Sequence, residues 1–381
     1  MKACYQKDFR LGILGGGQLG RMLIQEAINL DIRCAVLDPS AEAPCRYLVN
    51  EFTQGDLNDF DTVLAFGRKA DVLTIEIEHV NVDALEILEK EGVVVYPSPA
   101  ILKMVKDKGL QKQFYAEKNI ASAPFLLVEN VDEIAQALSV QSYMQKMRTG
   151  GYDGKGVQAL RKLEDIGKAF NVPSVLEEMV DFEKEIAVII ARNPSGEIKT
   201  FPLVEMEFNS EANLVEFLFS PASVSQDIEQ KADDLARKVV EALGFVGLLA
   251  VEMFVTKSGE VLVNEIAPRP HNSGHHTIEC CVTSQYEQQL RAILNLPLGD
   301  TTLLQPGVMI NLLGDKGFSG PVKYVGLEKA LHQPGVYVHL YGKAETKPFR
   351  KMGHVTVCNN DLETAKSVAR DVASFLKVTS N

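Results

Sequence analysis

Two short segments of the chain combine residue types that could do chemistry. In the first, Lys146–Gly156, an apolar run ends in a lysine and continues into a loop with four glycines. Glycines let backbone N–H groups approach an anion closely, and ammonium groups compensate its charge. The second, Asn264–His276, places a glutamate near an arginine and three histidines. A phosphate clamp followed by a carboxylate suited to Mg²⁺ favours chemistry driven by ATP.

The glycine loop is the more specific of the two signals. Predicted strands at Tyr143–Met147 and Val157–Arg161 flank it, so it forms the tip of a hairpin that can move as a lid. A flexible surface hairpin is the alternative, but such a hairpin seldom needs this many glycines. We expect these residues to contact the nucleotide: Lys146, Gly151, Tyr152, Asp153, Gly154, Lys155 and Gly156.

Two carboxylates lie on the predicted strands Leu248–Val255 and Val261–Ile266. Glu252 and Glu265 are about equally far from the turn between these strands, so both can point to one face and share Mg²⁺. Asn264 would complete the oxygen set. Two carboxylates this close need a cation between them, otherwise one must bind a proton. A solvated sheet face is the alternative, and the apolar neighbours disfavour it.

Polar residues are dense in the loop after that hairpin. They are Arg269, His271, Asn272, Ser273, His275 and His276. Such a loop predicts an anionic substrate site, in which Arg269 is suited to two-toothed capture of bicarbonate or phosphate. A cap on the following helix is the alternative for one of the histidines.

Further candidates come from an extended segment and a helix. The segment Glu177–Val180 has the form of an adenine-binding hinge, with Glu185 for the ribose, or of an edge strand with exposed acids. A continuous helix is expected over Ile101–Lys118. Its lysines would mostly form a solvated face, and Lys106 is the one we assign to the nucleotide.

The N-terminal region predicts a parallel sheet with a glycine turn. A strand at Leu11–Leu14 is followed by Gly15, Gly17 and Gly20, and Asp38 ends the next strand. This pattern alone suggests a nicotinamide dehydrogenase. The same turn also serves any anion at a helix N-terminus, or only a tight turn.

A compact basic turn stands near the C-terminus. Arg350 and Lys351 precede Met352-Gly353-His354, and Tyr341-Gly342-Lys343 comes shortly before them. A solvated charge run and a phosphate pocket are equally compatible with this pattern.

Composition limits the partners of the chain. With 381 residues, two or three domains are expected, and a net charge of −12 argues against nucleic acid and anionic membranes. No apolar run reaches membrane-spanning length, and the N-terminus lacks the apolar core of a signal peptide. The six cysteines show no C-x-x-C spacing, as expected for reduced thiols in the cytoplasm.

Together these segments resemble those of ATP-grasp enzymes, specifically the N5-carboxyaminoimidazole ribonucleotide synthetase family. The matching segments, in order, are GGGQLGRM, LDP, KDK, GGYDGKG, FEKE, VEMF, NEIAPRPHNSGHHT, YGK and RKMGH. The resemblance implies an α/β chain with an ATP-grasp fold, a Rossmann-like N-terminal domain, a small lid subdomain and a C-terminal α+β domain with a small barrel-like end. We expect the Rossmann-like domain at 1–99, the small subdomain at 100–174, and the large subdomain with the C-terminal region at 175–381, with a break near 305.

The family's reaction is ATP-dependent carbon–nitrogen ligation. 5-Aminoimidazole ribonucleotide and bicarbonate would give the N5-carbamate by way of carboxyphosphate, in a cytoplasmic homodimer of purine biosynthesis. One feature departs from many relatives: 201–270 contains no histidine, which puts one nucleotide contact in question.

The resemblance also implies roles for individual residues. ATP would contact Lys106, Lys146, Gly151 to Gly156, Glu177, Glu178, Met179, Val180, Glu185, Asn264 and Glu265, while Glu252 and Glu265 hold Mg²⁺. The ribonucleotide side would comprise Gly17, Gln18, Leu19, Glu76, Tyr152, Asp153, Arg269, His271, Asn272, Ser273, Lys343, Arg350 and Lys351. Arg269, Asp153 and Lys155 would act in catalysis. A formate-dependent transformylase or a biotin carboxylase component is the alternative within the superfamily, and a nicotinamide dehydrogenase is the alternative outside it.

Overall fold

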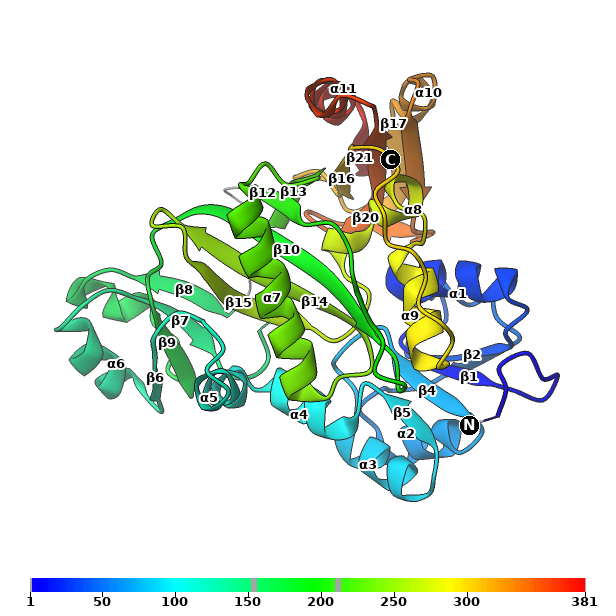
Figure 1. Ribbon diagram of the computed structural model, residues 1–381, viewed down its shortest axis with the longest axis horizontal. Helices are drawn as coiled ribbons and strands as arrows, with labels where there is room; N and C mark the ends of the chain where they lie inside the picture. The colour runs from blue at the N-terminus through cyan, green and yellow to red at the C-terminus, as the bar shows by residue number, and fades with distance from the viewer. Residues whose placement is uncertain (1, 152–155, 210–213, 381) are drawn as a thin grey trace.

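The computed structural model describes residues 2–151, 156–209 and 214–380 (Figure 1). Its N-terminal part is a parallel five-stranded sheet with helices on both faces. The strands in spatial order are β3 (Glu51–Gln54), β2 (Cys34–Asp38), β1 (Leu11–Leu14), β4 (Val72–Ile75) and β5 (Val94–Tyr96). All residues of β1 and β4 are buried, as expected for strands covered on both faces.

Helices from two parts of the chain cover this sheet. On one face, α1 (Gln18–Asn29) shares a core with α9 (Gln285–Ile293), which lies beside it in Figure 1. On the other face lie α2 (Phe60–Gly67) and α3 (Val82–Lys90). The N-terminal sheet is therefore packed against α9, a helix that comes shortly after the polar loop and nearly two hundred residues after the last strand of this sheet.

The glycine turn between β1 and α1 is closed by two carboxylates. Asp38 accepts the N–H of Gly16 at 2.7 Å and, with its other oxygen, the N–H of Ser40 at 2.8 Å. Glu76 accepts the N–H of Gly20 at 2.6 Å. A Cβ at Gly17 would lie 2.3 Å from Glu76 Oε1, so a larger residue there would displace the Glu76 carboxylate. Asp38 therefore shapes the turn itself.

The hairpin that is expected to act as a lid belongs to a small antiparallel sheet. Its spatial order is β6 (Phe125–Val128), β9 (Ser174–Glu178), β7 (Tyr143–Met147) and β8 (Val157–Leu160), with α6 (Val131–Leu138) and a 3₁₀ helix (Leu163–Lys168) beside it. Lys146 is paired with Val157, which confirms the two predicted strands, the second ending at Leu160. Tyr152, Asp153, Gly154 and Lys155 lie outside the described residues.

The prediction of a single helix over Ile101–Lys118 was wrong. Two helices, α4 (Pro99–Lys106) and α5 (Lys108–Glu117), meet at Asp107, whose backbone is extended at φ −118° and ψ 106°. Asp107 Oδ1 accepts the N–H groups of Gly109 and Leu110 at 2.8 and 3.2 Å, which caps α5. Arg148 donates two hydrogen bonds to the same carboxylate, at 3.0 and 2.7 Å.

The largest sheet has nine strands and joins the middle of the chain to its C-terminal region. Its main path is β15 (Val261–Ala267), β14 (Gly247–Thr256), β10 (Phe182–Arg192), β12 (Val204–Asn209), β13 (Leu214–Ser220), β16 (Gly307–Leu313), β20 (Lys351–Cys358) and β18 (Val336–Leu340), and β11 (Ile198–Thr200) pairs with β10. Helix α7 (Gln226–Leu243) packs over β10, β14 and β15. One sheet thus carries both the carboxylate hairpin and the basic turn.

The C-terminal end adds a second, smaller layer. Strands β17 (Gly320–Val325), β19 (Glu345–Thr346) and β21 (Lys377–Ser380) form a three-stranded sheet, and α10 (Leu327–Leu331) and α11 (Leu362–Phe375) complete the region. A bridge between Gly314 and Val378 connects this sheet to the end of β16. Short α8 (Thr277–Cys280) follows the polar loop.

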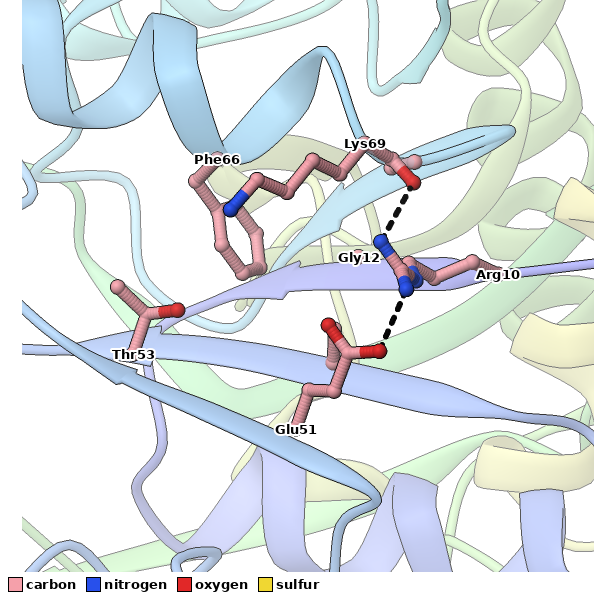
Figure 2. A pocket seen from close by; sticks show the side chains of 8 residues that line it. Arg10, Gly12, Glu51, Thr53, Phe66 and Lys69 are labelled. Atoms are coloured by element: carbon pink, nitrogen blue, oxygen red, sulfur yellow. Dashed lines mark hydrogen bonds and ion pairs between the residues drawn. The ribbon is translucent and has the colours of Figure 1, made fainter.

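A small cavity lies at the start of β1 (Figure 2). There Arg10 donates to the carboxylate of Glu51 and to the carbonyl of Lys69. Ligands of open α/β sheets bind at the carboxyl ends of the strands, and this cavity is at the amino ends. We therefore assign Arg10 a structural role, joining β1 to its neighbours.

The cap at Asp107 gives a stability prediction. Asp107→Ala should lower the free energy of unfolding by about 1 to 2 kcal/mol, because α5 loses its side-chain acceptor. Asp361→Ala is a matched control, since Asp361 caps α11 by accepting the N–H of Thr364 at 2.8 Å. Urea unfolding followed by circular dichroism measures both. A gain in stability for Asp107→Ala would mean that α4 and α5 fuse once the aspartate is gone.

Candidate active site

The centre of the site is a buried group of two lysines around one glutamate. Lys146 on β7 lies 2.8 Å from Glu177 on β9 and donates to Asn264 at 2.9 Å. Lys112 on α5 lies 3.3 Å from the other oxygen of Glu177. Burial raises the pKa of Glu177, but the two ammonium groups together hold it below its usual range. Glu177 is thus an ionised carboxylate.

The two predicted metal carboxylates lie opposite each other. Glu252 on β14 is paired with Glu265 on β15, so the predicted facing is confirmed. Lys108 lies 3.1 Å from Glu265 and lowers the pKa of that carboxyl, whereas burial and the charge of Glu265 raise the pKa of Glu252. A carboxyl pair that favours a proton on one member fits a divalent cation, which would supply the missing positive charge.

The lysine that reaches this pair is Lys108, which the sequence patterns did not single out. Lys106 ends α4 and donates to the carbonyl of Val80 at 2.9 Å, on the side of the N-terminal sheet. Lys108 begins α5 and points to Glu265. The helix break at Asp107 separates the two lysines, so the nucleotide role assigned to Lys106 is not supported by a place in this cluster.

The expected adenine and ribose residues lie around the end of β9 and on β10. Burial raises the pKa of Glu185 to about 7; the charge of Glu265 adds to this rise and the charge of Lys146 opposes it. The Glu178 side chain is exposed and accepts from Gln141 at 2.9 Å, and its N–H donates to Pro124 at 2.9 Å. Met179 and Val180 follow the strand, with Met179 37% exposed.

Arg269 connects the polar loop to the N-terminal sheet. Its Nε lies 2.8 Å from Glu78, in the loop after β4, and its guanidinium donates to the carbonyl of Pro270 at 3.1 Å. Burial raises the pKa of Glu76, and the charges of Arg269 and Lys343 oppose that rise. Arg269 and Lys343 therefore lie near the carboxylate that accepts from the glycine turn.

The rest of the polar loop is tied to the large sheet. His271 Nδ1 lies 2.9 Å from the Ser273 hydroxyl and 3.7 Å from Glu252. Asn272 and Asn311 exchange two amide hydrogen bonds of 2.8 Å each. Asn311 on β16 is a partner that the sequence patterns did not suggest, because it is remote along the chain.

Two lysines of the basic turn lie near this region, whereas no contact among the described residues places Arg350 there. Lys343 donates to the carbonyl of Lys351 at 2.7 Å, and Arg350 donates to the carbonyl of Glu345 at 2.6 Å. The positive charge of Lys351 acts against the raised pKa of Glu252. Lys343 and Lys351 thus lie near carboxylates of the predicted substrate side and metal pair, respectively.

Comparison with known proteins matches three consecutive parts of the chain. They are a ribonucleotide synthetase preATP-grasp domain at 9–106, an ATP-grasp domain at 113–286 and a phosphoribosylaminoimidazole carboxylase C-terminal domain at 307–368. The N5-carboxyaminoimidazole ribonucleotide synthase of Bacillus subtilis is 38% identical over 352 residues, covering 91% of this chain and 90% of that protein. The chain belongs to the N5-carboxyaminoimidazole ribonucleotide synthase family.

Further relatives agree with this family. The phosphoribosylaminoimidazole carboxylase of Ogataea methanolica is 38% identical over 367 residues, covering 92% of this chain and 67% of that protein. The solved N5-carboxyaminoimidazole ribonucleotide synthetase of Thermotoga maritima has a TM-score of 0.91 at 42% identity, covering 98% of this chain and all of that one.

A synthase from Aspergillus clavatus was solved with ADP and 5-aminoimidazole ribonucleotide. Its TM-score is 0.87 at 32% identity, covering 96% of this chain and 98% of that one. The expected ATP-grasp fold is therefore confirmed, and the family excludes a nicotinamide dehydrogenase. Within the described ranges, no helix combines the length and apolarity needed to cross a membrane.

Two buried histidines of the polar loop predict an acid-sensitive fold. Burial lowers the pKa of His276 to about 4 and that of His275 well below its usual range. Below pH 6.5 these two histidines therefore bind more protons in the unfolded chain than in the folded one. The free energy of unfolding should fall by about 1.4 kcal/mol per pH unit for each such histidine as the pH drops toward 4.

Urea unfolding at several pH values measures this dependence. His276→Phe should flatten it, because a titrating group has gone. His332→Gln is the control, since His332 is exposed at the end of α10, and it should leave the dependence unchanged. Equal pH dependence in the parent and His276→Phe would contradict the assignment.

Proposed function

We propose that the chain catalyses the reaction of its family. ATP, bicarbonate and 5-aminoimidazole ribonucleotide give N5-carboxyaminoimidazole ribonucleotide, ADP and phosphate, a carbon–nitrogen ligation in purine biosynthesis. One observation carries this proposal: the facing carboxylates Glu252 and Glu265 lie beside Lys108, near His271 of the polar loop and within reach of the charge of Lys351 in the basic turn. Such a site holds a metal-bound polyphosphate and a second anion together.

ATP would occupy the lysine and carboxylate cluster. Lys108 lies 3.1 Å from Glu265, and the charge of Lys146 also lowers the pKa of Glu265, so both ammonium groups can contact phosphate oxygens there. Glu252 and Glu265 would hold Mg²⁺, with Asn264 nearby, and Mg²⁺ would neutralise charge on the transferred phosphoryl group. Backbone groups near Met179 and Val180 would meet the adenine, and Glu185 the ribose.

Bicarbonate needs activation because it is a poor electrophile. Its oxygen attacks the γ-phosphorus and ADP leaves, which gives carboxyphosphate. Arg269 would stabilise that anion with its planar guanidinium, held in place by Glu78. Carboxyphosphate then releases phosphate and CO₂, and the amine forms its new bond to carbon before CO₂ escapes.

The ribonucleotide would lie between the glycine turn and the basic turn. Gly17, Gln18 and Leu19 begin α1, where backbone N–H groups attract anions, and Glu76 lies beneath them. The polar-loop residues His271, Asn272 and Ser273 would line the middle. Lys343, Arg350 and Lys351 would take the 5′-phosphate. Tyr152, Asp153 and Lys155 in the lid keep their predicted roles, with Asp153 orienting or deprotonating the amine.

Location and assembly are also part of the proposal. All six cysteines are free thiols, which suits the reducing cytoplasm. A homodimer is proposed by family likeness, and light scattering of the purified chain tests it. The reaction itself is tested by phosphate release from ATP with and without aminoimidazole ribonucleotide and bicarbonate. Release should require both, and release independent of the ribonucleotide would contradict the proposal.

The carboxylate pair gives a prediction for turnover. Glu265→Gln, like Lys146→Ala, should reduce phosphate release by at least two orders of magnitude, because charge compensation at Mg²⁺ or phosphate is lost without emptying a core. Glu229→Gln, on the exposed side of α7, is the control and should be fully active. Near-normal activity of Glu265→Gln at saturating Mg²⁺ would remove this residue from the site.

The basic turn gives a prediction for substrate affinity. Replacing both Arg350 and Lys351 by Ala should raise KM for the ribonucleotide by one to several orders of magnitude, since each charged hydrogen bond lost costs roughly 1.5 to 3 kcal/mol. KM for ATP should barely change. An equal rise in KM for both substrates would indicate unfolding. An unchanged KM for both would mean that the turn is a solvated surface that does not contact the ribonucleotide.

A further inference from the structure

Three histidine rings lie in a row beside the basic turn, with one pair stacked and the other tilted. His339 on β18 and His354 on β20 are paired across their strands, with ring centroids 4.5 Å apart. His275, from the polar loop, lies 4.7 Å from His354 on the other side. We call these three residues the histidine column. His275 and His354 are buried, so the column joins the polar loop to the last strands of the large sheet.

Tyr341 attaches this column to the N-terminal domain. Its hydroxyl is 3.0 Å from His354 Nδ1, and its ring meets His275 edge-on at 6.4 Å. The ring is 1% exposed and belongs to the same apolar core as Leu11 and Met22, on β1 and α1. A side chain of the C-terminal region is thus part of the core that supports the glycine turn.

The chain turns toward the proposed phosphate site directly after this tyrosine. Gly342 has φ +74°, which a larger residue adopts only with strain. The Lys343 ammonium then lies 5.7 Å from the Tyr341 ring centroid and donates to the carbonyl of Lys351 at 2.7 Å. The position of Lys343 therefore depends on where the tyrosine ring is held.

We propose that Tyr341 is a positioning residue for the ribonucleotide. Its ring packs against the N-terminal domain, and its hydroxyl is bonded to His354. Together these contacts hold Lys343 at the distance from the glycine turn that the 5′-phosphate requires. This inference rests on the proposed function, in which Lys343 contacts that phosphate. A purely structural tyrosine would contribute to folding alone.

Tyr341→Phe tests the hydroxyl while keeping the ring. KM for the ribonucleotide should rise about five- to tenfold, the loss expected when one hydrogen bond no longer fixes a charged contact. KM for ATP and kcat should stay unchanged. Tyr286→Phe is the matched control, because it also removes a buried tyrosine hydroxyl, 2.9 Å from His275 Nδ1. Unlike Tyr341, Tyr286 is not followed by a lysine of the proposed phosphate site. Its KM should equal the parent's.

A double-mutant cycle with Lys343→Ala separates this inference from the proposed function. If Tyr341 acts through Lys343, then Tyr341→Phe should have no further effect on KM once Lys343 is alanine. An unchanged KM in Lys343→Ala would overturn the proposed phosphate contact itself. Three results would overturn the positioning role alone. The first is a KM that rises in Lys343→Ala but not in Tyr341→Phe. The others are effects on KM that multiply in the double variant, and a rise in KM in Tyr286→Phe equal to that in Tyr341→Phe.

Discussion

The balance of buried charge is the constraint on which the site depends. An isolated ion buried in a protein costs several kcal/mol, so each charged side chain here needs a partner. Lys146 and Lys112 carry two positive charges against the one negative charge of Glu177. Glu252 and Glu265 carry two negative charges against the one positive charge of Lys108, unless one carboxylate binds a proton. The surplus cation suits a phosphate and the surplus carboxylate suits a metal ion. A metal-bound polyphosphate satisfies both needs at once.

The large sheet brings these groups together. The carboxylate pair lies near one end of the strand order and the basic turn near the other, and the polar loop runs between them. Helix α9 and Tyr341 then fix the N-terminal sheet against this framework, so that Arg269 reaches Glu78. The same contacts that stabilise the domain packing also set the width of the proposed substrate site.

Local pattern predicted what is local in the structure. The lid strands and the facing of Glu252 and Glu265 follow from alternation within a short hairpin, and the structure agrees. The glycine turn was predicted too, and Asp38, which the dehydrogenase alternative would use as a ribose ligand, closes this turn with its two oxygens. Its partners are backbone groups, which residue types do not reveal.

The missed features depend on residues distant in sequence. The break at Asp107 is stabilised by Arg148, and it decides that Lys108 rather than Lys106 reaches Glu265. Lys112 was read as part of a solvated face, yet it is 2% exposed because Glu177 lies against it. A helical pattern of lysines cannot distinguish these cases. The roles of residues 152–155 in the lid stay predictions.

The most direct test is a crystal structure of the chain with Mg²⁺ and a non-hydrolysable ATP analogue. The balance of charge predicts the metal ion between Glu252 and Glu265, with phosphate oxygens within hydrogen-bonding distance of the Lys146 and Lys108 ammonium groups. A nucleotide bound instead at the glycine turn after β1, with no metal between the two carboxylates, would contradict the account.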